Sequence, residues 1–172
     1  MGHVVRKISR AKWDPKEELG SDAISADAVT SDLRTNGNCL SFWECTDANS
    51  EIELHEIVLA LAGAFERLDK IDVAWIDQDV AAKKGITFEK SEGRTLVADL
   101  RKKHLDAIQL ELNKITILAK LLAKAVRNDN NFRRYTRKDV LKVLTEAIQK
   151  GRLSIDELPE NIRKSVGSMI RS

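Results

Sequence analysis

The strongest constraint on the fold is a strand, helix, strand succession between residues 35 and 76. The sequence TNGN at 35–38 is a turn signal, because Asn-Gly accepts a positive φ, and 39–45 is rich in residues that favour strands. Apolar residues then recur at intervals of three and four behind a Ser-x-x-Glu capping pattern, which predicts a helix over 51–68. A strand over 71–76 follows. The spacing fits a βαβ unit, and equally a meander with a helix laid over it.

Two shorter strands are expected around this succession. Val4, Val5 and Ile8 allow a strand near the N-terminus, and 86–88 predicts another directly after Gly85. Residues 1–92 are therefore expected to form a mixed α/β part.

The second part of the chain predicts helices throughout. No Gly or Pro interrupts 95–127, and an apolar stripe at three and four runs from Val97 to Val126, with His104 on it. A helix of that length would measure about 50 Å, longer than the roughly 40 Å diameter of a compact domain of this size. We therefore expect it to bend, break, protrude or pair with a second copy in a homodimer.

Capping signals predict further helices after residue 135. Thr136 with Asp139 begins one that Gly151 ends, and Ser154 with Glu157 begins a short helical turn. The expected fold class is α+β, a small sheet with a covering helix followed by a long helix and a C-terminal helical cluster. The chain has 172 residues, which suits one compact unit in which 93–172 packs on 1–92.

The charge is nearly balanced overall but divided along the sequence. The formal net charge is +2, whereas residues 13–92 carry seven basic against eighteen acidic side chains and 94–152 carry fifteen against six. The overall charge favours neither a nucleic-acid nor a membrane partner. The division predicts an acidic first part and a basic second part.

Targeting and redox signals are weak. The N-terminus is charged within six residues, Arg6 stands where a myristoylation site needs Ser or Thr, and no uncharged run approaches a membrane span. We expect a soluble cytoplasmic protein that does not bind membranes. Cys39 and Cys45 are expected to be free thiols, because a strand holds them about 20 Å apart.

No catalytic motif is complete. His55-Glu56 lacks the second His of the helical zinc signature, since position 59 is Leu59. Asp72, Asp77 and Asp79 resemble the acids of a cation-dependent hydrolase only weakly, because Phe88 stands two residues before Lys90, where such a site needs another acid. We expect no catalytic residue, no metal and no cofactor.

The leading functional hypothesis is a non-catalytic protein-binding module of the adaptor, inhibitor or immunity type. An acidic surface steers association with a basic partner, so the N-terminal part is expected to dock one. The residues expected to form this docking surface are Glu51, Glu53, Glu56, Asp72, Asp77 and Asp79.

The alternative hypothesis is a nucleic-acid-associated protein that uses the basic segment 127–142. Arginine pairs with phosphate and aromatic rings stack on bases. The residues expected to carry this binding are Arg127, Phe132, Arg133, Arg134, Tyr135, Arg137 and Lys138. A competing interpretation is that the basic segment packs on the acidic part of the same chain.

Overall fold

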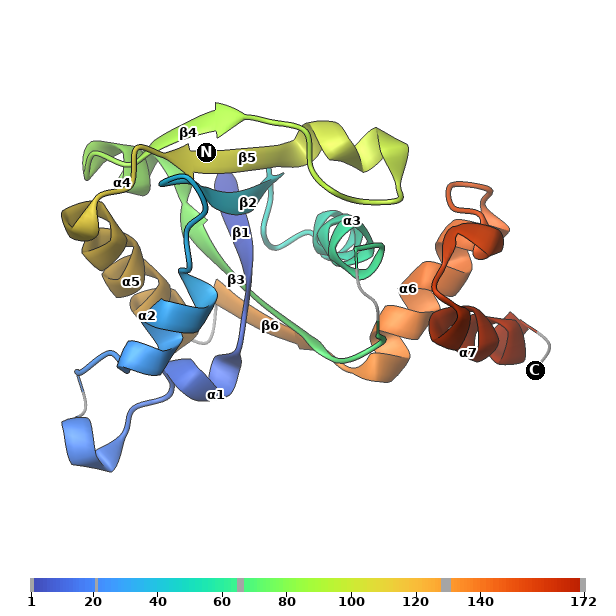
Figure 1. Cartoon of the computed structure of the whole chain (residues 1–172), viewed down its shortest axis with the longest axis horizontal. Coiled ribbons are helices and arrows are strands. Elements are labelled where there is room, and N and C mark those ends of the chain that lie inside the picture. Colours follow the sequence, from blue (N-terminus) through green and yellow to red (C-terminus); the bar gives the residue numbers. More distant parts are fainter. Residues whose placement is uncertain (1, 21, 65–66, 128–130, 171–172) are drawn as a thin grey trace.

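The computed structural model describes residues 2–20, 22–64, 67–127 and 131–170. Six strands form one sheet in the order β4-β5-β2-β1-β3-β6, and all neighbouring strands are antiparallel (Figure 1). The strands are β1 (His3–Ile8), β2 (Leu40–Cys45), β3 (Ile71–Asp77), β4 (Thr87–Lys90), β5 (His104–Ile108) and β6 (Phe132–Tyr135). The α+β class is confirmed.

The succession β2, α3 (Glu51–Ala62), β3 is a βαβ unit with β1 inserted between its strands. Both β2 and β3 are antiparallel to β1, so they run parallel to each other and α3 is their crossover. Helix α3 ends at Ala62 rather than at 68. Gly63 follows it, and a Cβ there would lie 3.2 Å from the Thr95 hydroxyl oxygen. The expected helical residues Phe65 and Glu66 lie outside the described part of the chain.

The expected long helix over 95–127 is wrong. Only α5 (Leu112–Arg127) is α-helical there, and it is preceded by a 3-10 helix, η2 (Ala98–Lys103), and by strand β5. Strand β5 pairs with β2 on one side and β4 on the other, so backbone hydrogen bonds from distant segments override the local helical pattern. Gln109, at φ 53°, turns the chain out of the strand.

The second part of the chain is therefore not helical throughout, because it contributes β5 and β6 to the sheet. His104, expected on a helical stripe, lies on β5. At 16 residues α5 measures about 24 Å, which removes the argument that its length requires a second copy. A homodimer stays a prediction without that support.

The predicted caps after residue 135 are confirmed. In α6 (Arg137–Gln149) the Thr136 side chain and the Asp139 carboxylate form a reciprocal capping box. Gly151 ends this region at φ 68°, where a side chain would be strained. A second capping box begins the 3-10 helix η4 (Ile155–Glu157), and α7 (Glu160–Ile170) follows.

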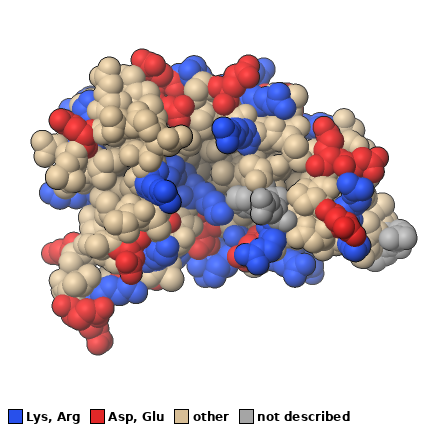
Figure 2. All heavy atoms as spheres, viewed as in Figure 1, with Lys and Arg blue, Asp and Glu red and all other residues tan. Residues whose placement is uncertain are grey.

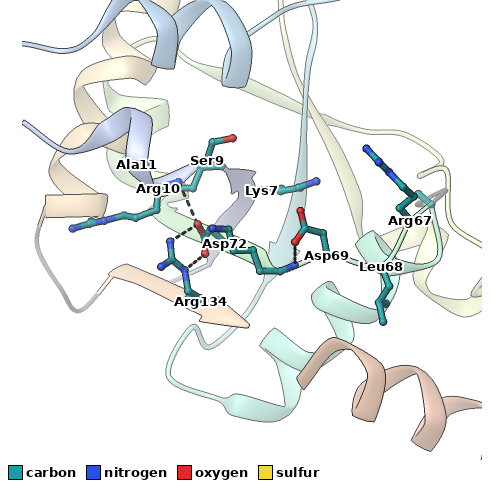
Figure 3. A pocket seen from close by; sticks show the side chains of 12 residues that line it. Lys7, Ser9, Arg10, Ala11, Arg67, Leu68, Asp69, Asp72 and Arg134 are labelled. Carbon is teal, nitrogen blue, oxygen red and sulfur yellow. Dashed lines mark hydrogen bonds and ion pairs between the residues drawn. The ribbon is translucent and has the colours of Figure 1, made fainter. Parts of the chain in front are cut away.

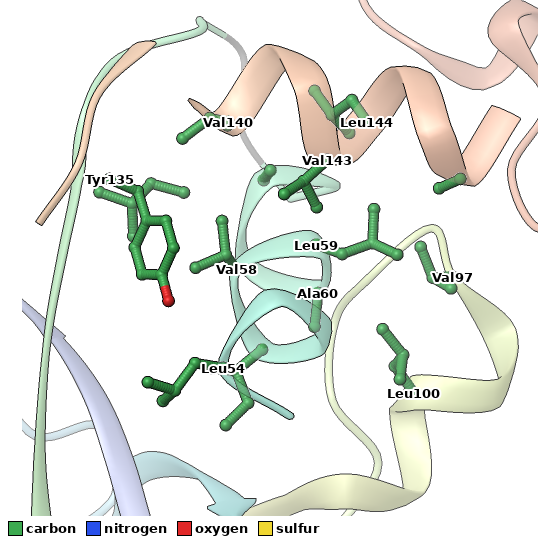
Figure 4. Close-up of a cluster of buried hydrophobic side chains, with 14 of the residues drawn as sticks. Leu54, Val58, Leu59, Ala60, Val97, Leu100, Tyr135, Val140, Val143 and Leu144 are labelled. Carbon is green, nitrogen blue, oxygen red and sulfur yellow. The ribbon is translucent and has the colours of Figure 1, made fainter. Parts of the chain in front are cut away.

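Buried side chains cover both faces of the sheet. On one face, α3 lies between the sheet and α6, and Val58, Leu59 and Val143 interdigitate there (Figure 4). On the other face, α5 packs with α1 (Arg10–Trp13), α2 (Ala26–Asp32) and α4 (Gln78–Lys83). A further 3-10 helix, η1 (Glu17–Leu19), follows α1. Among the described helices, none is long and apolar enough to cross a membrane.

Candidate anion-binding cleft

A cleft of about 810 Å³ opens where β1 ends and β3 begins, beside edge strand β6 (Figure 3). Three separate segments of the chain meet there. Its lining is Lys7, Ile8, Ser9, Arg10 and Ala11 from the end of β1 and the start of α1; Ala64, Arg67, Leu68, Asp69, Lys70 and Asp72 from the segment after α3 and the start of β3; and Arg134 from β6.

The described lining of this cleft carries more positive than negative charge. Five cationic side chains, those of Lys7, Arg10, Arg67, Lys70 and Arg134, face only two carboxylates, Asp69 and Asp72. Figure 2 shows Lys and Arg side chains in the hollowed middle of this face of the molecule. A concave surface with an excess of one sign of charge concentrates its field, so the cleft attracts anions.

Asp72 is the buried anchor of the cleft. It lies on β3 opposite Ile8 of β1 and Arg134 of β6, and only 4% of it is exposed. The Arg134 guanidinium donates two hydrogen bonds to its carboxylate, at 2.7 and 2.9 Å, and the Arg10 backbone N–H donates a third at 3.3 Å. The bonds to Asp72 raise the pKa of Arg134, so this arginine stays charged.

The other cations differ in how firmly they are held. Arg10 pairs with Asp14 at 3.0 Å and lies 4.9 Å from the centre of the Phe132 ring. Burial lowers the pKa of Lys7, although nearby carboxylates, Asp69 first, oppose the shift. Arg67 and Lys70 are exposed at the rim. The cleft thus combines fixed cations at its base with exposed cations at its entrance.

The acidic residues expected to dock a partner do not form one surface. Glu53 accepts a hydrogen bond from the Thr46 backbone N–H at 2.6 Å, and Asp77 caps α4 through the Val80 N–H at 2.9 Å. Glu56 is held by Arg152 at 2.6 and 2.7 Å. With Asp72 buried, four of the six carboxylates serve internal contacts, and the other two, Glu51 and Asp79, are exposed on different helices.

The basic residues expected in the segment 127–142 likewise do not form one surface. Arg127 donates to the carbonyl oxygens of Trp13 and Ala23, so it ties α5 to the N-terminal segment. Tyr135 is buried, and burial raises the pKa of its hydroxyl.

The remaining residues of this segment lie nearer the surface. Phe132 is half-buried under Arg10, and Arg133 lies 3.8 Å from Glu51. Arg137 and Lys138 are exposed at the start of α6. Of the seven residues, only Arg134 lines the cleft, and neither aromatic ring offers an open stacking platform.

Sequence reasoning missed four of the five cleft cations, Lys7, Arg10, Arg67 and Lys70. Lys7 and Arg10 belong to a short segment of four basic and no acidic residues at 1–12, which was a usable signal. Arg67 and Lys70 lie in a stretch whose average charge is negative. Only the order of the strands brings these residues together, because β1 lies beside β3 and β3 beside β6.

Metal and thiol chemistry receive no support from the described residues. Among them, no group of three or more His, Cys, Asp or Glu side chains could hold a metal ion. Both cysteines are free thiols, as expected from their separation. Burial raises the pKa of Cys45 to about 12, which suppresses the reactive thiolate.

Comparisons with known proteins leave the site to be interpreted from its geometry. No protein-family model matches the sequence, and neither a curated protein nor a solved structure shows significant similarity to it.

Proposed function

We propose that the protein is a nucleic-acid-associated protein that binds the phosphate backbone in the cleft between β1, β3 and β6. The observation that carries this proposal is that five cationic residues from three distant segments line one concave site. Guanidinium and ammonium groups are the side chains that bind phosphate, and phosphate contacts supply most of the affinity in nucleic-acid binding.

The internal pairing of Asp72 supports binding of an anion rather than a cation. Its carboxylate already receives three hydrogen bonds, so the more deeply buried of the two acids in the cleft is neutralised. The exposed cations Arg67 and Lys70 then face one exposed carboxylate of the cleft, Asp69. The two hydrogen bonds to Asp72 also hold the Arg134 guanidinium in a fixed orientation.

Docking of a basic protein through the acidic part, predicted from the sequence, is the weaker proposal. Four of its six carboxylates hold helix caps, a loop backbone or ion pairs, so they are less available to a partner. The competing intramolecular interpretation of the basic segment has direct support at Arg127 and Arg134. The proposed site therefore uses Arg134 together with cations from the N-terminal part.

The test is the salt dependence of binding to a fluorescent single-stranded RNA dodecamer, followed by anisotropy between 50 and 200 mM salt. Affinity should fall steeply with salt, by a slope of about 0.7 per phosphate contact. The double substitution Arg67→Ala with Lys70→Ala should reduce that slope by up to about 1.4, since two contacts are removed.

The matched control is Lys83→Ala with Lys84→Ala, which removes the same charge from exposed positions at the opposite end of β3. The control should leave the slope unchanged. Binding that is absent at 50 mM salt, or equally weakened by both double variants, would overturn the proposed function.

A further inference from the structure

The cleft continues into a groove across the sheet. A second hollow of about 300 Å³ shares Lys7, Ile8 and Ser9 with the cleft. A third, of about 480 Å³, shares Ser41, Trp43 and Leu61 with the second. One groove therefore runs from β1 over β2 to β5, between the sheet and the C-terminal end of α3.

The chemistry of the groove changes from one end to the other. The cleft end is rich in cations, whereas the end at β5 has two carboxylates, Glu92 and Asp106, beside one cation, Arg94. Asp106 lies directly opposite Ser41 on the neighbouring strand, and the Ser41 hydroxyl donates to its carboxylate at 3.3 Å. The Asp106 carboxylate is a hydrogen-bond acceptor at this end, so it suits a ligand group that carries N–H donors.

An aromatic side chain lies between the two ends. Trp43 borders both the second and the third hollow, with its ring 5.1 Å from that of His104. Gly93 packs against it so closely that a Cβ would lie 2.6 Å from the indole ring. The indole is thus held in place on one side, and the 6% of Trp43 that is exposed gives the middle of the groove a small apolar surface.

The two ends of the groove are connected through β2. Strand β1 pairs with β2 only over His3–Val5, so Lys7 lies beyond the paired part of these strands. Arg6, next to Lys7, donates a hydrogen bond to the Ser41 carbonyl oxygen at 2.5 Å, and Ser41 lies opposite Asp106 on β5. A strand whose phosphates lie in the cleft can therefore extend its bases along the groove toward Ser41 and Asp106.

We infer that the groove binds single-stranded nucleic acid and prefers bases that carry an exocyclic amino group. This inference rests on the proposed function and names its ligand. The Asp106 carboxylate accepts a hydrogen bond from that amino group, as carboxylates do with the N4 amine of cytosine. Uracil presents a carbonyl oxygen at that position and is disfavoured. A recessed groove admits a splayed single strand, whereas duplexes are read by a protruding helix or ribbon.

The experiment compares oligocytidine and oligouridine dodecamers in direct competition for the full chain. The wild type should bind oligocytidine at least about fivefold more tightly, the lower end of base discrimination by one such contact. Asp106→Ala should abolish the preference and leave the salt slope unchanged. Glu111→Ala is the matched control, because it removes one exposed acid outside the groove, and it should keep the preference.

A second variant and a small ligand complete the test. Ser41→Ala removes the hydroxyl that donates to Asp106 and should weaken the preference, so the inference can be tested even where Asp106→Ala fails to fold. Cytidine monophosphate should compete far more weakly than the dodecamer, because it offers one phosphate. Competition of equal strength would overturn a strand as the ligand.

The two proposals fail in different ways. Salt-dependent binding with equal affinity for both dodecamers overturns the base preference and leaves the phosphate site standing. Absence of salt-dependent binding to either dodecamer overturns the proposed function itself.

Discussion

Two of the ion pairs that join the acidic and basic parts of the chain differ in what surrounds them. In both, an arginine grips a carboxylate with two hydrogen bonds: Arg152 holds Glu56, and Arg134 holds Asp72. Arg152 also forms an ion pair with a second acid, Asp99, whose carboxylate oxygen lies 2.7 Å from the guanidinium. Around Asp72 and Arg134 the other charged side chains that line the open cleft are four cations and one carboxylate, Asp69.

The difference shows that the pair itself does not decide the role of a site. At Arg152 two acids surround one cation, so no positive charge is left over for an anion, and the contact fastens α3 to the segment after α6. At Asp72 one buried acid holds one arginine, and the exposed cations Arg67 and Lys70 at the rim are left to act on solvent and ligands. The excess of charge around a pair, rather than the pair, distinguishes a binding site from a structural contact.

The largest expected effect is at the cleft, from Arg134→Met. Removal of the arginine leaves the Asp72 carboxylate buried without its main partner. The free energy of unfolding should fall by about 3 kcal/mol, at the lower end for a broken buried pair, because Arg134 itself is half-exposed. Urea denaturation measures the loss.

The double variant Asp72→Asn with Arg134→Met sharpens this prediction. It removes the uncompensated charge, so it should recover much of the lost stability. A single Arg134→Met variant as stable as the wild type would show that Asp72 is well hydrated, contrary to its burial.

An intermediate effect is expected from Arg152→Met, about 2 kcal/mol, because hydrogen bonds to two partly exposed carboxylates are lost. Hydrogen bonds from Arg152 hold the pKa of Glu56 below its usual value of 4.5. The stabilisation is therefore complete above pH 4.5 and is lost as the pH falls through the lowered pKa. Denaturation at a series of pH values should show the wild type and the variant converging in acid; a constant difference would contradict this assignment.

The smallest effect on stability is expected from Arg67→Ala with Lys70→Ala, below about 0.5 kcal/mol, because both side chains are exposed. The same substitutions should change nucleic-acid binding the most. Thermal unfolding beside Lys83→Ala with Lys84→Ala measures the first property. A marked destabilisation specific to the cleft variant would show that Arg67 and Lys70 stabilise the fold, as Arg152 does, and would contradict the distinction between the two sites.

The elements that the sequence predicted well are those with local signals. The strand predicted at 39–45 is β2 and begins at Leu40, and Gly37 of the preceding turn adopts the expected positive φ. The second residue at positive φ is Asn38 rather than Asn36. Helix α6 begins at its predicted capping box. In each case a few neighbouring residues determine the backbone, so periodicity and caps suffice.

The failures have a common physical cause, which is pairing over long distances in the sequence. The segment HLDAI of β5 fits a helical stripe and a strand equally well, and its pairing with β2 and β4 decides between them. The cleft depends on the same kind of information. No local pattern indicates that Lys7, Lys70 and Arg134 share one site, because their proximity follows from strand order alone.

The placement of β1 at the centre of the sheet has a consequence for how the chain folds. Strand β1 pairs with residues near 45 and 77, and β3 pairs on its other side with residues near 135. Each closure spans tens of residues of loop, and such non-local topologies fold slowly. During synthesis the acidic part emerges first, while Asp72 still lacks Arg134. The cleft is thus among the last features to be assembled, and an incomplete chain exposes the edge of β3.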